Sequence, residues 1–210
     1  MPKIAVFEKN ATRYDTWFEN HYHVYTSELL AVKQMIPDGV GIEVKTGTGR
    51  FASPLNIQYG IEPSIKMGKV AMKRGVCVIG GVAENLPLKS SLFDFVTMIV
   101  TVCFLDDGFA SFQEAYRVLK LSGHVMLGII DKESILGKIY QKSSSPFYRG
   151  ATFYSFEELV TLLDNSGFTH FTCVQTLFHE LDEITRVEPV KKGHGEGSFL
   201  VISAVKDGLP

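Results

Sequence analysis

Short apolar runs that alternate with helical sequence between residues 40 and 130 constrain the fold more than any other feature. The runs have the length and the β-branched composition of buried strands. They are Val40–Val44, Ile57–Ile61, Val76–Ile79, Phe95–Val102 and His124–Ile130. Because parallel strands need crossover connections, this alternation predicts five parallel strands with helices on both faces of the sheet.

Two further apolar runs, Phe171–Leu177 and Phe199–Val205, lie nearer the C-terminus. The stretch between them, 188–198, holds three glycines and one proline and shows no helical periodicity. Strands joined by such a loop are expected to pair antiparallel. The prediction is therefore an α/β fold with a doubly wound seven-stranded sheet, in which five parallel strands precede an antiparallel hairpin.

Two helix starts are predicted from the capping-box spacing, a hydroxyl residue followed three positions later by an acid. Thr16 with Glu19 precedes an apolar stripe at steps of three and four that ends before Pro37. Ser155 with Glu158 opens a second helix, which is expected to end at Gly167.

The chain has 210 residues, a length that fits one domain, 1–210, and its net charge of −2 gives no basic surface for nucleic acid or an anionic membrane. The longest uncharged apolar stretch, Phe95–Leu105, is too short to span a bilayer. Charges at Lys3 and Glu8 interrupt any signal-peptide core. The three cysteines lack C-x-x-C spacing and are interpreted as small buried hydrophobes, so we expect a cytoplasmic protein.

Acidic residues and glycines stand where the predicted parallel strands end. Ligands of doubly wound sheets bind beyond these carboxyl ends. The loop Glu43–Arg50 holds two glycines, which let a ligand approach the backbone closely. Glu62 follows the second strand and is suited to accept both hydroxyls of a ribose, and Glu84 follows the third. These features together predict a site for an adenosine-type nucleoside.

Five motifs stand in order along the chain: Glu43–Arg50, Gly60–Ser64, Ala83–Pro87, Phe93–Val96 and Arg117–Gly123. In order and spacing they resemble the class I S-adenosylmethionine (SAM)-dependent methyltransferases, specifically the small-molecule, methyltransferase type 11 branch. The resemblance extends from about residue 14 to residue 205. It implies a Rossmann-like sheet whose last strand inserts antiparallel beside the sixth, SAM as cofactor, and methyl transfer to an N, O or C atom of a small-molecule acceptor.

The resemblance also implies roles for individual residues. Glu43 would orient the first loop and the amino group of the methionine moiety. Glu62 would take the ribose hydroxyls, and Glu84, beside the backbone of Ala83, would accept from the adenine amine. The cofactor-binding residues implied are Glu43, Lys45, Gly47, Gly49, Glu62, Pro63, Ala83, Glu84, Thr101 and Val102.

Lys45 departs from the family pattern, which usually has glycine at this position. It would either reach the methionine carboxylate or crowd the site. A decayed, non-catalytic SAM-binding protein is therefore one alternative function. A nucleotide-dependent oxidoreductase is another, because Gly47–Ala52 also matches G-x-G-x-x-A. Lys45 fits poorly in a dinucleotide-binding loop, and no Tyr-x-x-x-Lys stretch lies where a short-chain enzyme needs it.

Two segments with few motifs are expected to build the acceptor side. The N-terminal segment 1–38 resembles the helical lid of this branch, and 132–154 is a variable insert rich in aromatic residues. The acceptor contacts expected from these segments are Tyr14, Trp17, Phe18, Phe147 and Tyr148.

A general base is needed only if the acceptor must lose a proton early. The candidates are Tyr14, His21, His23 and Asp106. Asp106 is followed by Asp107, and for this pair a place at a helix N-terminus is the equal alternative. Because His21 and His23 lie two positions apart on a predicted helix, they point to opposite sides and cannot share a metal, and no metal site is expected. The sequence does not define the acceptor or the oligomeric state.

Overall fold

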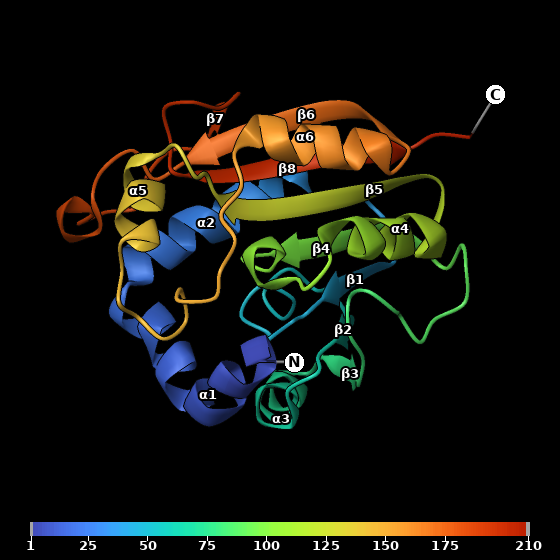
Figure 1. The fold of residues 1–210 in the computed structure, drawn as a ribbon, viewed down its shortest axis with the longest axis horizontal. Coiled ribbons are helices and arrows are strands. Elements are labelled where there is room, and N and C mark those ends of the chain that lie inside the picture. The colour runs from blue at the N-terminus through green and yellow to red at the C-terminus, as the bar shows by residue number, and fades with distance from the viewer. Residues whose placement is uncertain (1, 209–210) are drawn as a thin grey trace.

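The computed structural model describes residues 2–208 and holds one mixed sheet, with strands in the order β3-β2-β1-β4-β5-β8-β6-β7 (Figure 1). The strands are β1 (Gly41–Val44), β2 (Tyr59–Ile61), β3 (Cys77–Ile79), β4 (Phe93–Ile99), β5 (Leu119–Ile130), β6 (Phe168–Thr176), β7 (Lys191–Lys192) and β8 (Phe199–Lys206). The first five pair parallel, and β8 inserts antiparallel between β5 and β6. The predicted α/β architecture is confirmed, while residues 1, 209 and 210 of the predicted 1–210 domain lie outside the described part.

The predicted number of strands, seven, is wrong, because β7 adds an eighth. β7 consists of Lys191 and Lys192, which pair antiparallel with Gln175 and Val174. Both lysines are exposed. A two-residue edge strand with exposed lysines has no apolar alternation, so a hydrophobicity pattern carries no signal for it.

The end of β4 also differs from the prediction, which extended this strand to Val102. Val100 has a φ of +52°, a left-handed conformation that ends the extended run. The chain then turns through a short 3₁₀ helix, η1 (Val102–Phe104). This turn changes the direction of the chain at the carboxyl edge of the sheet.

The helices are α1 (Pro2–Asn20), α2 (Tyr22–Met35), α3 (Ile65–Lys73), α4 (Gly108–Val118), α5 (Ile135–Gln141) and α6 (Phe156–Asn165), with a second 3₁₀ helix, η2 (Leu181–Glu183). The predicted helix start at Thr16 is wrong, because Thr16 lies inside α1. The chain breaks its helical path instead at His21, between α1 and α2. The start at Ser155 is confirmed: the Ser155 hydroxyl accepts from the Glu158 N–H, and the Glu158 carboxylate accepts from the Ser155 N–H.

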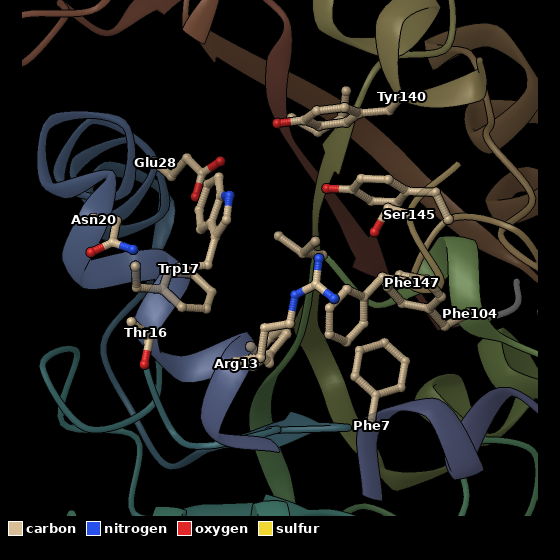
Figure 2. A pocket seen from close by; sticks show the side chains of 15 residues that line it. Phe7, Arg13, Thr16, Trp17, Asn20, Glu28, Phe104, Tyr140, Ser145 and Phe147 are labelled. Carbon is tan, nitrogen blue, oxygen red and sulfur yellow. The ribbon is translucent and has the colours of Figure 1, made fainter. Parts of the chain in front are cut away.

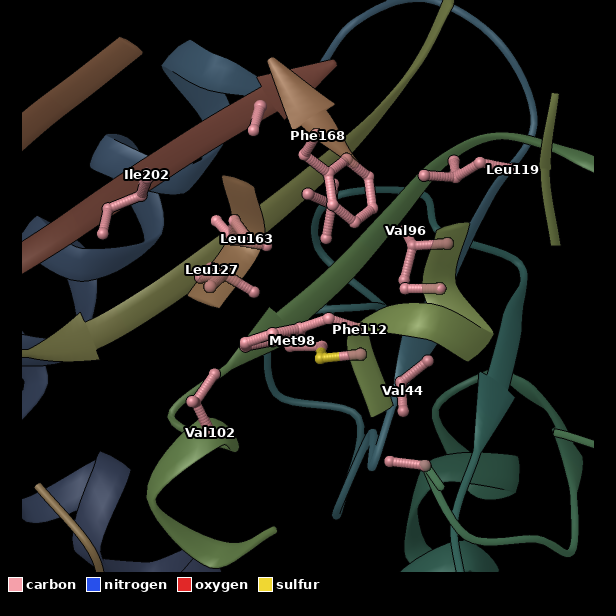
Figure 3. Packing of buried hydrophobic residues seen from close by; sticks show 14 of the residues in the cluster. Val44, Val96, Met98, Val102, Phe112, Leu119, Leu127, Leu163, Phe168 and Ile202 are labelled. Carbon is pink, nitrogen blue, oxygen red and sulfur yellow. The ribbon is translucent and has the colours of Figure 1, made fainter. Parts of the chain in front are cut away.

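Helices cover both faces of the sheet, as the alternation predicts. Side chains of β4 alternate between the faces, with Val96 and Met98 in the cluster that includes Phe112 of α4 and Leu163 of α6 (Figure 3). On the opposite face α2 packs against β6 and β8. In Figure 1 the arrowheads of β4 and β5 point toward the side where α1 and α5 lie. The carboxyl edge of the parallel strands is therefore bordered by α1 and α5.

The cysteines are less buried than predicted. Cys77 is exposed at the edge strand β3, and Cys103 and Cys173 are half-buried. All three are free thiols. The prediction fails at Cys77 because β3 is the last strand on its side of the sheet. None of the helices between residues 2 and 208 combines the length and the apolarity that crossing a membrane requires.

Candidate functional site

Glu43 lies at the end of β1 with its carboxyl group buried beneath the loop that follows. Its Oε2 accepts from the Thr46 hydroxyl at 2.6 Å and from the Ala52 N–H at 3.1 Å. Burial raises the pKa of Glu43 to about 8, against the opposing effect of these two hydrogen bonds. Glu43 therefore ties the two ends of the loop together from inside.

Three residues of the loop have a left-handed backbone conformation. Lys45, Gly47 and Gly49 have φ values of +55°, +60° and +77°. Glycine adopts this conformation without a steric cost, which explains why the family that the sequence resembles usually has a glycine at the position of Lys45. A Cβ added to Gly49 would meet Ala71 of α3 at 3.2 Å, so Gly49 serves the packing of the loop on α3.

Lys45 projects into the interior at the carboxyl edge of the sheet. Its Nζ donates to the backbone carbonyl of Phe104 at 2.9 Å. Burial lowers the pKa of Lys45, and the nearby carboxylates of Glu62 and Glu84 oppose that effect. The ammonium thus lies among acidic groups in a largely desolvated position.

Glu62 follows β2 and bridges two loops. Its Oε2 accepts from the Gly47 N–H and its Oε1 from the Ser64 N–H, both at 2.8 Å. Burial raises the pKa of Glu62, and the two N–H groups and the Lys45 ammonium counteract it. Pro63 separates Glu62 from Ser64, the N-cap of α3. The orientation of the carboxylate is fixed, and each oxygen keeps a lone pair for a further donor.

Glu84 stabilises the chain after η1. Its Oε1 accepts from the N–H groups of Asp106 and Asp107, at 2.9 Å and 3.4 Å. Asp107 is the N-cap of α4 and accepts from the Ala110 N–H. Ala83, directly before Glu84, is fully buried. The helix-start alternative for the Asp106–Asp107 pair therefore applies to Asp107.

Thr101 and Val102 lie where the chain leaves β4. Thr101 lines a small cavity at the carboxyl edge. The side chain of Val102 points into the core (Figure 3), so this residue presents only its backbone at the edge.

This small cavity, which we call the inner cleft, has a volume of about 30 Å³. It is lined by Phe7, Tyr14, Lys45, Gly47, Glu62, Met67, Val100, Thr101 and Phe104. The polar groups of the inner cleft suit an adenosyl ligand: a fixed carboxylate at Glu62 and the loop backbone at Gly47, which lines the cleft. Its volume holds about one water molecule. Such a ligand is larger than this volume, so the inner cleft must widen to admit it, and Phe7 and Tyr14 of α1 form part of its wall.

Ionic contacts hold α1 over the inner cleft. Asp15 accepts from both Arg50 and Arg74, with its Oδ2 at 2.8 Å from each guanidinium. These hydrogen bonds hold the pKa of Asp15 well below its usual range although burial acts to raise it. Glu8 accepts from the Ser64 hydroxyl near the start of α3. Between these two anchors α1 is kinked at Asn10.

A second, larger cavity lies next to the inner cleft. This outer cavity has a volume of about 510 Å³ and is lined mainly by residues of α1, of α2 and of the insert, which includes α5 (Figure 2). All five residues predicted as acceptor contacts line it: Tyr14, Trp17, Phe18, Phe147 and Tyr148. The two cavities share Phe7, Tyr14, Val100 and Phe104 in their walls.

Only one of the four predicted base candidates, Tyr14, lines the outer cavity. Burial and the Glu43 carboxylate raise the pKa of Tyr14 far above neutrality, so its hydroxyl stays protonated. His21 is instead stacked on Trp17, with ring centroids 4.4 Å apart, and His23 is exposed. Within residues 2–208 there is no cluster of three or more His, Cys, Asp or Glu side chains that would hold a metal.

Glu28 is the main residue of the outer cavity that sequence reasoning missed. It is 4% exposed and lies on the buried face of α2 with Val24, Ala31 and Val32. The signal was present in the sequence, because Glu28 falls three and four positions from these apolar residues. An acid in that register is an exception to the apolar stripe, and it is informative because acids are rarely buried without a partner.

Residues 42–127 match the family model described as a methyltransferase domain. An uncharacterized protein of Methanocaldococcus jannaschii is 44% identical over 205 residues, which cover 97% of this chain and 100% of that protein. A crystal structure from Thermotoga maritima, described as a SAM-dependent methyltransferase and possible histamine N-methyltransferase, is 48% identical with a TM-score of 0.96. It covers 98% of this chain and 100% of its own.

The fold is also that of phosphoethanolamine N-methyltransferase 2 of Haemonchus contortus, solved with SAM (TM-score 0.62, 16% identity, 87% of this chain and 53% of that chain). These relationships place the chain among SAM proteins and not among dinucleotide-dependent oxidoreductases. The sheet, in which β8 inserts antiparallel between β5 and β6, has the arrangement that the resemblance predicts. The chain belongs to the class I SAM-dependent methyltransferases of the type 11 branch, and its cofactor is SAM.

Proposed function

We propose that this protein catalyses methyl transfer from SAM to a small-molecule acceptor that occupies the outer cavity. The observation that supports this most is the shared wall of the two cavities, formed by Phe7, Tyr14, Val100 and Phe104. Because the two cavities are neighbours, a ligand in the inner cleft and one in the outer cavity would lie next to each other. The volume of the outer cavity, about 510 Å³, lies within the range of small-molecule sites, about 300–1,000 Å³.

The cofactor would be held by the residues at the ends of the parallel strands. Glu62 would accept from the ribose hydroxyls, and the backbone of the loop at Gly47 would lie beside the ligand. Lys45 would offer its ammonium to the methionine carboxylate by exchanging the Phe104 carbonyl for it. The remaining contacts proposed are Glu43, Gly49 and Pro63, which shape the loops, and Ala83, Glu84, Thr101 and Val102 at the edge.

Bound SAM supplies a methyl group that its sulfonium sulfur already activates. The protein then has to align the acceptor atom with this methyl group and exclude water, and alignment of this kind is worth about 7–11 kcal/mol in favourable models. Tyr14 and Phe7 of α1 close the inner cleft from outside. We propose that α1, with the rest of segment 1–38, acts as a lid that opens for the cofactor by bending at Asn10.

The acceptor atom is N, O or C in this proposal. The description of the Thermotoga relative as a possible histamine N-methyltransferase favours nitrogen. Free thiols at all three cysteines are compatible with a reducing compartment, so we also propose that the protein works in the cytoplasm.

Calorimetric titration with SAM and its demethylated product, followed by a turnover assay, tests the proposal. The assay supplies amines, phenols and carboxylates and measures the demethylated product. Binding of SAM with turnover of at least one acceptor supports the enzyme. Binding without turnover across the panel supports the non-catalytic SAM-binding alternative, and absence of SAM binding contradicts both.

A further inference from the structure

The carboxyl group of Glu28 lies at the wall of the outer cavity without a visible partner for one of its oxygens. Its Oε2 is inaccessible to solvent and has no hydrogen-bond partner among residues 2–208. Figure 2 shows the side chain reaching from α2 toward the cavity, beside Trp17. A buried polar atom without a partner is costly, typically by about 1–3 kcal/mol, and therefore calls for an explanation. A hydrogen-bond donor on a ligand supplies one when the carboxyl group turns toward the cavity that Glu28 lines.

The other walls of the outer cavity are mostly aromatic. Trp17 and Phe18 come from α1, Tyr140 from α5, and Phe147 and Tyr148 from the insert. The rings of Tyr140 and Tyr148 are stacked, with centroids 4.6 Å apart. Aromatic faces attract organic cations, and a carboxylate attracts them too, while both repel an anionic ligand.

The remaining titratable groups around Glu28 do not neutralise it. Tyr14, Tyr25, Tyr140 and Tyr148 interact with it electrostatically, and the pKa of each is raised, so these phenols stay neutral. Arg13 of α1 lines the cavity, but its side chain is exposed and lies over the ring of Phe147 at 5.9 Å. The sheet strands packed on α2 bring apolar residues, Val174, Phe199 and Val201.

We propose that the acceptor is a compact amine, and that Glu28 binds its nitrogen and accepts the proton which the nitrogen must lose before methylation. This inference rests on the proposed methyl transfer and assigns the substrate class and the base of that site. A hydroxyl acceptor can also use a carboxylate as its base, but only an ammonium ion is attracted by both the carboxylate charge and the aromatic faces.

The proton and electron balance is complete without a further reactant. The acceptor enters as R–NH₃⁺ and pairs with the Glu28 carboxylate, which takes one N–H proton on one of its oxygens. The freed nitrogen lone pair forms the N–C bond while the C–S bond breaks and its electron pair returns to sulfur. The product leaves as R–NH₂⁺–CH₃, and the proton on Glu28 passes to solvent.

Burial raises the pKa of Glu28 to about 8, a value that suits a base acting on an amine. Because the carboxyl group must be ionised to accept the proton, kcat/KM should rise with pH up to about 8. In the Glu28→Gln variant this rise should disappear.

The test uses the full chain saturated with the demethylated product of SAM and three probes that differ in charge: 2-phenylethylammonium, 2-phenylethanol and 3-phenylpropionate. Binding is measured by calorimetry for the wild type, Glu28→Gln and Asp164→Asn. Asp164 is an exposed acid on α6, far from the site in sequence, and serves as the matched loss of one negative charge. We expect the wild type and Asp164→Asn to prefer the ammonium probe at least tenfold, and Glu28→Gln to lose this preference.

The stability of the same variants provides a second readout. A carboxyl group whose pKa is raised on folding is protonated in the folded chain and ionised in the unfolded chain between about pH 4.5 and 8, so wild-type stability falls as pH rises through this window. Glu28→Gln should therefore gain Tm relative to wild type from pH 5 to pH 8, which also shows that the variant folds.

Preference for the alcohol or carboxylate probe, retention of the ammonium preference in Glu28→Gln, or no binding of any probe at millimolar concentration would each overturn the inference. All three results are read on protein already shown to bind the SAM product. They are therefore distinct from a failure of the proposed function, in which SAM and its product do not bind.

Discussion

At the residue scale, three buried glutamates show how the environment assigns different tasks to one side chain. Glu43 accepts its hydrogen bonds from residues of the loop that follows β1, and Glu62 is fixed by two backbone N–H groups. Glu28 has an oxygen with no partner among residues 2–208 and lines a cavity. Desolvation raises the pKa of all three, so burial alone does not distinguish them. The hydrogen-bond partners do.

Glu62→Ala is predicted to weaken SAM binding by about tenfold to a hundredfold. The change removes the proposed acceptor of the ribose hydroxyls and the bridge between Gly47 and Ser64. Hydrogen bonds to a charged group are worth about 1.5–3 kcal/mol each, which sets this range. Isothermal titration with SAM measures it. Unchanged affinity within error would show that Glu62 does not hold the ribose.

Lys45→Met is predicted to lower SAM affinity by roughly tenfold. Methionine keeps the length of the side chain and removes the charge that faces Glu62 and Glu84 and that we assign to the methionine carboxylate. The same titration decides between the two roles that the sequence left open. Tighter binding by the variant would mean that the lysine crowds the cleft.

At the element scale, local capping chemistry and long-range packing both shape the helices. α6 begins at a complete capping box at Ser155. α1 has no comparable start at Thr16 and is held in place by Asp15, Arg50 and Arg74 instead. A capping pattern is therefore informative only where tertiary contacts do not extend the helix past it.

Ser155→Ala is predicted to cost about 0.5–2 kcal/mol of unfolding free energy, because it removes the N-cap acceptor of α6. Urea unfolding followed by circular dichroism measures the loss. Thr161→Ala, an exposed change on the same helix, is the control and should stay within about 0.5 kcal/mol of wild type. If the two changes lowered the unfolding free energy equally, the loss in Ser155→Ala could not be attributed to the capping box.

At the scale of the whole molecule, the arrangement of α1 over the parallel edge defines the two cavities. The inner cleft of about 30 Å³ is closed by Phe7 and Tyr14, and the outer cavity of about 510 Å³ lies beside it. The proposed lid role of α1 would link binding of an adenosyl ligand to movement of this helix. Asp15 connects this helix to Arg50 and Arg74 beneath it.

Asp15→Asn is predicted to increase amide hydrogen exchange in α1 by several-fold while exchange in β4 and β5 stays unchanged. The partly buried ion pairs of Asp15 with two arginines oppose opening of the lid, and the amide cannot replace them. Exchange mass spectrometry of wild type and variant, with and without SAM, measures the effect. Equal protection of α1 in both proteins would contradict the role of α1 as a lid.

The sequence determined the parts of this protein that depend on neighbouring residues. Apolar runs and turn residues predicted the parallel strands. The positions of Glu43 near the end of the first strand and of Glu62 directly after the second placed both at the carboxyl edge. Strand β7 escaped prediction because two exposed lysines carry no periodic signal. The motif resemblance supplied the family and its cofactor.

Only the tertiary structure decided which groups remain available to a ligand. The outer cavity is built mainly from α1 and α2 near the N-terminus and from the insert, which includes α5 and lies about a hundred residues later. Their packing leaves one oxygen of Glu28 without a partner among the described residues. Secondary structure follows from local backbone preferences and hydrophobic periodicity, which a sequence displays directly. Burial and unsatisfied hydrogen bonds are properties of the packed chain, because they depend on what every other segment places around a side chain.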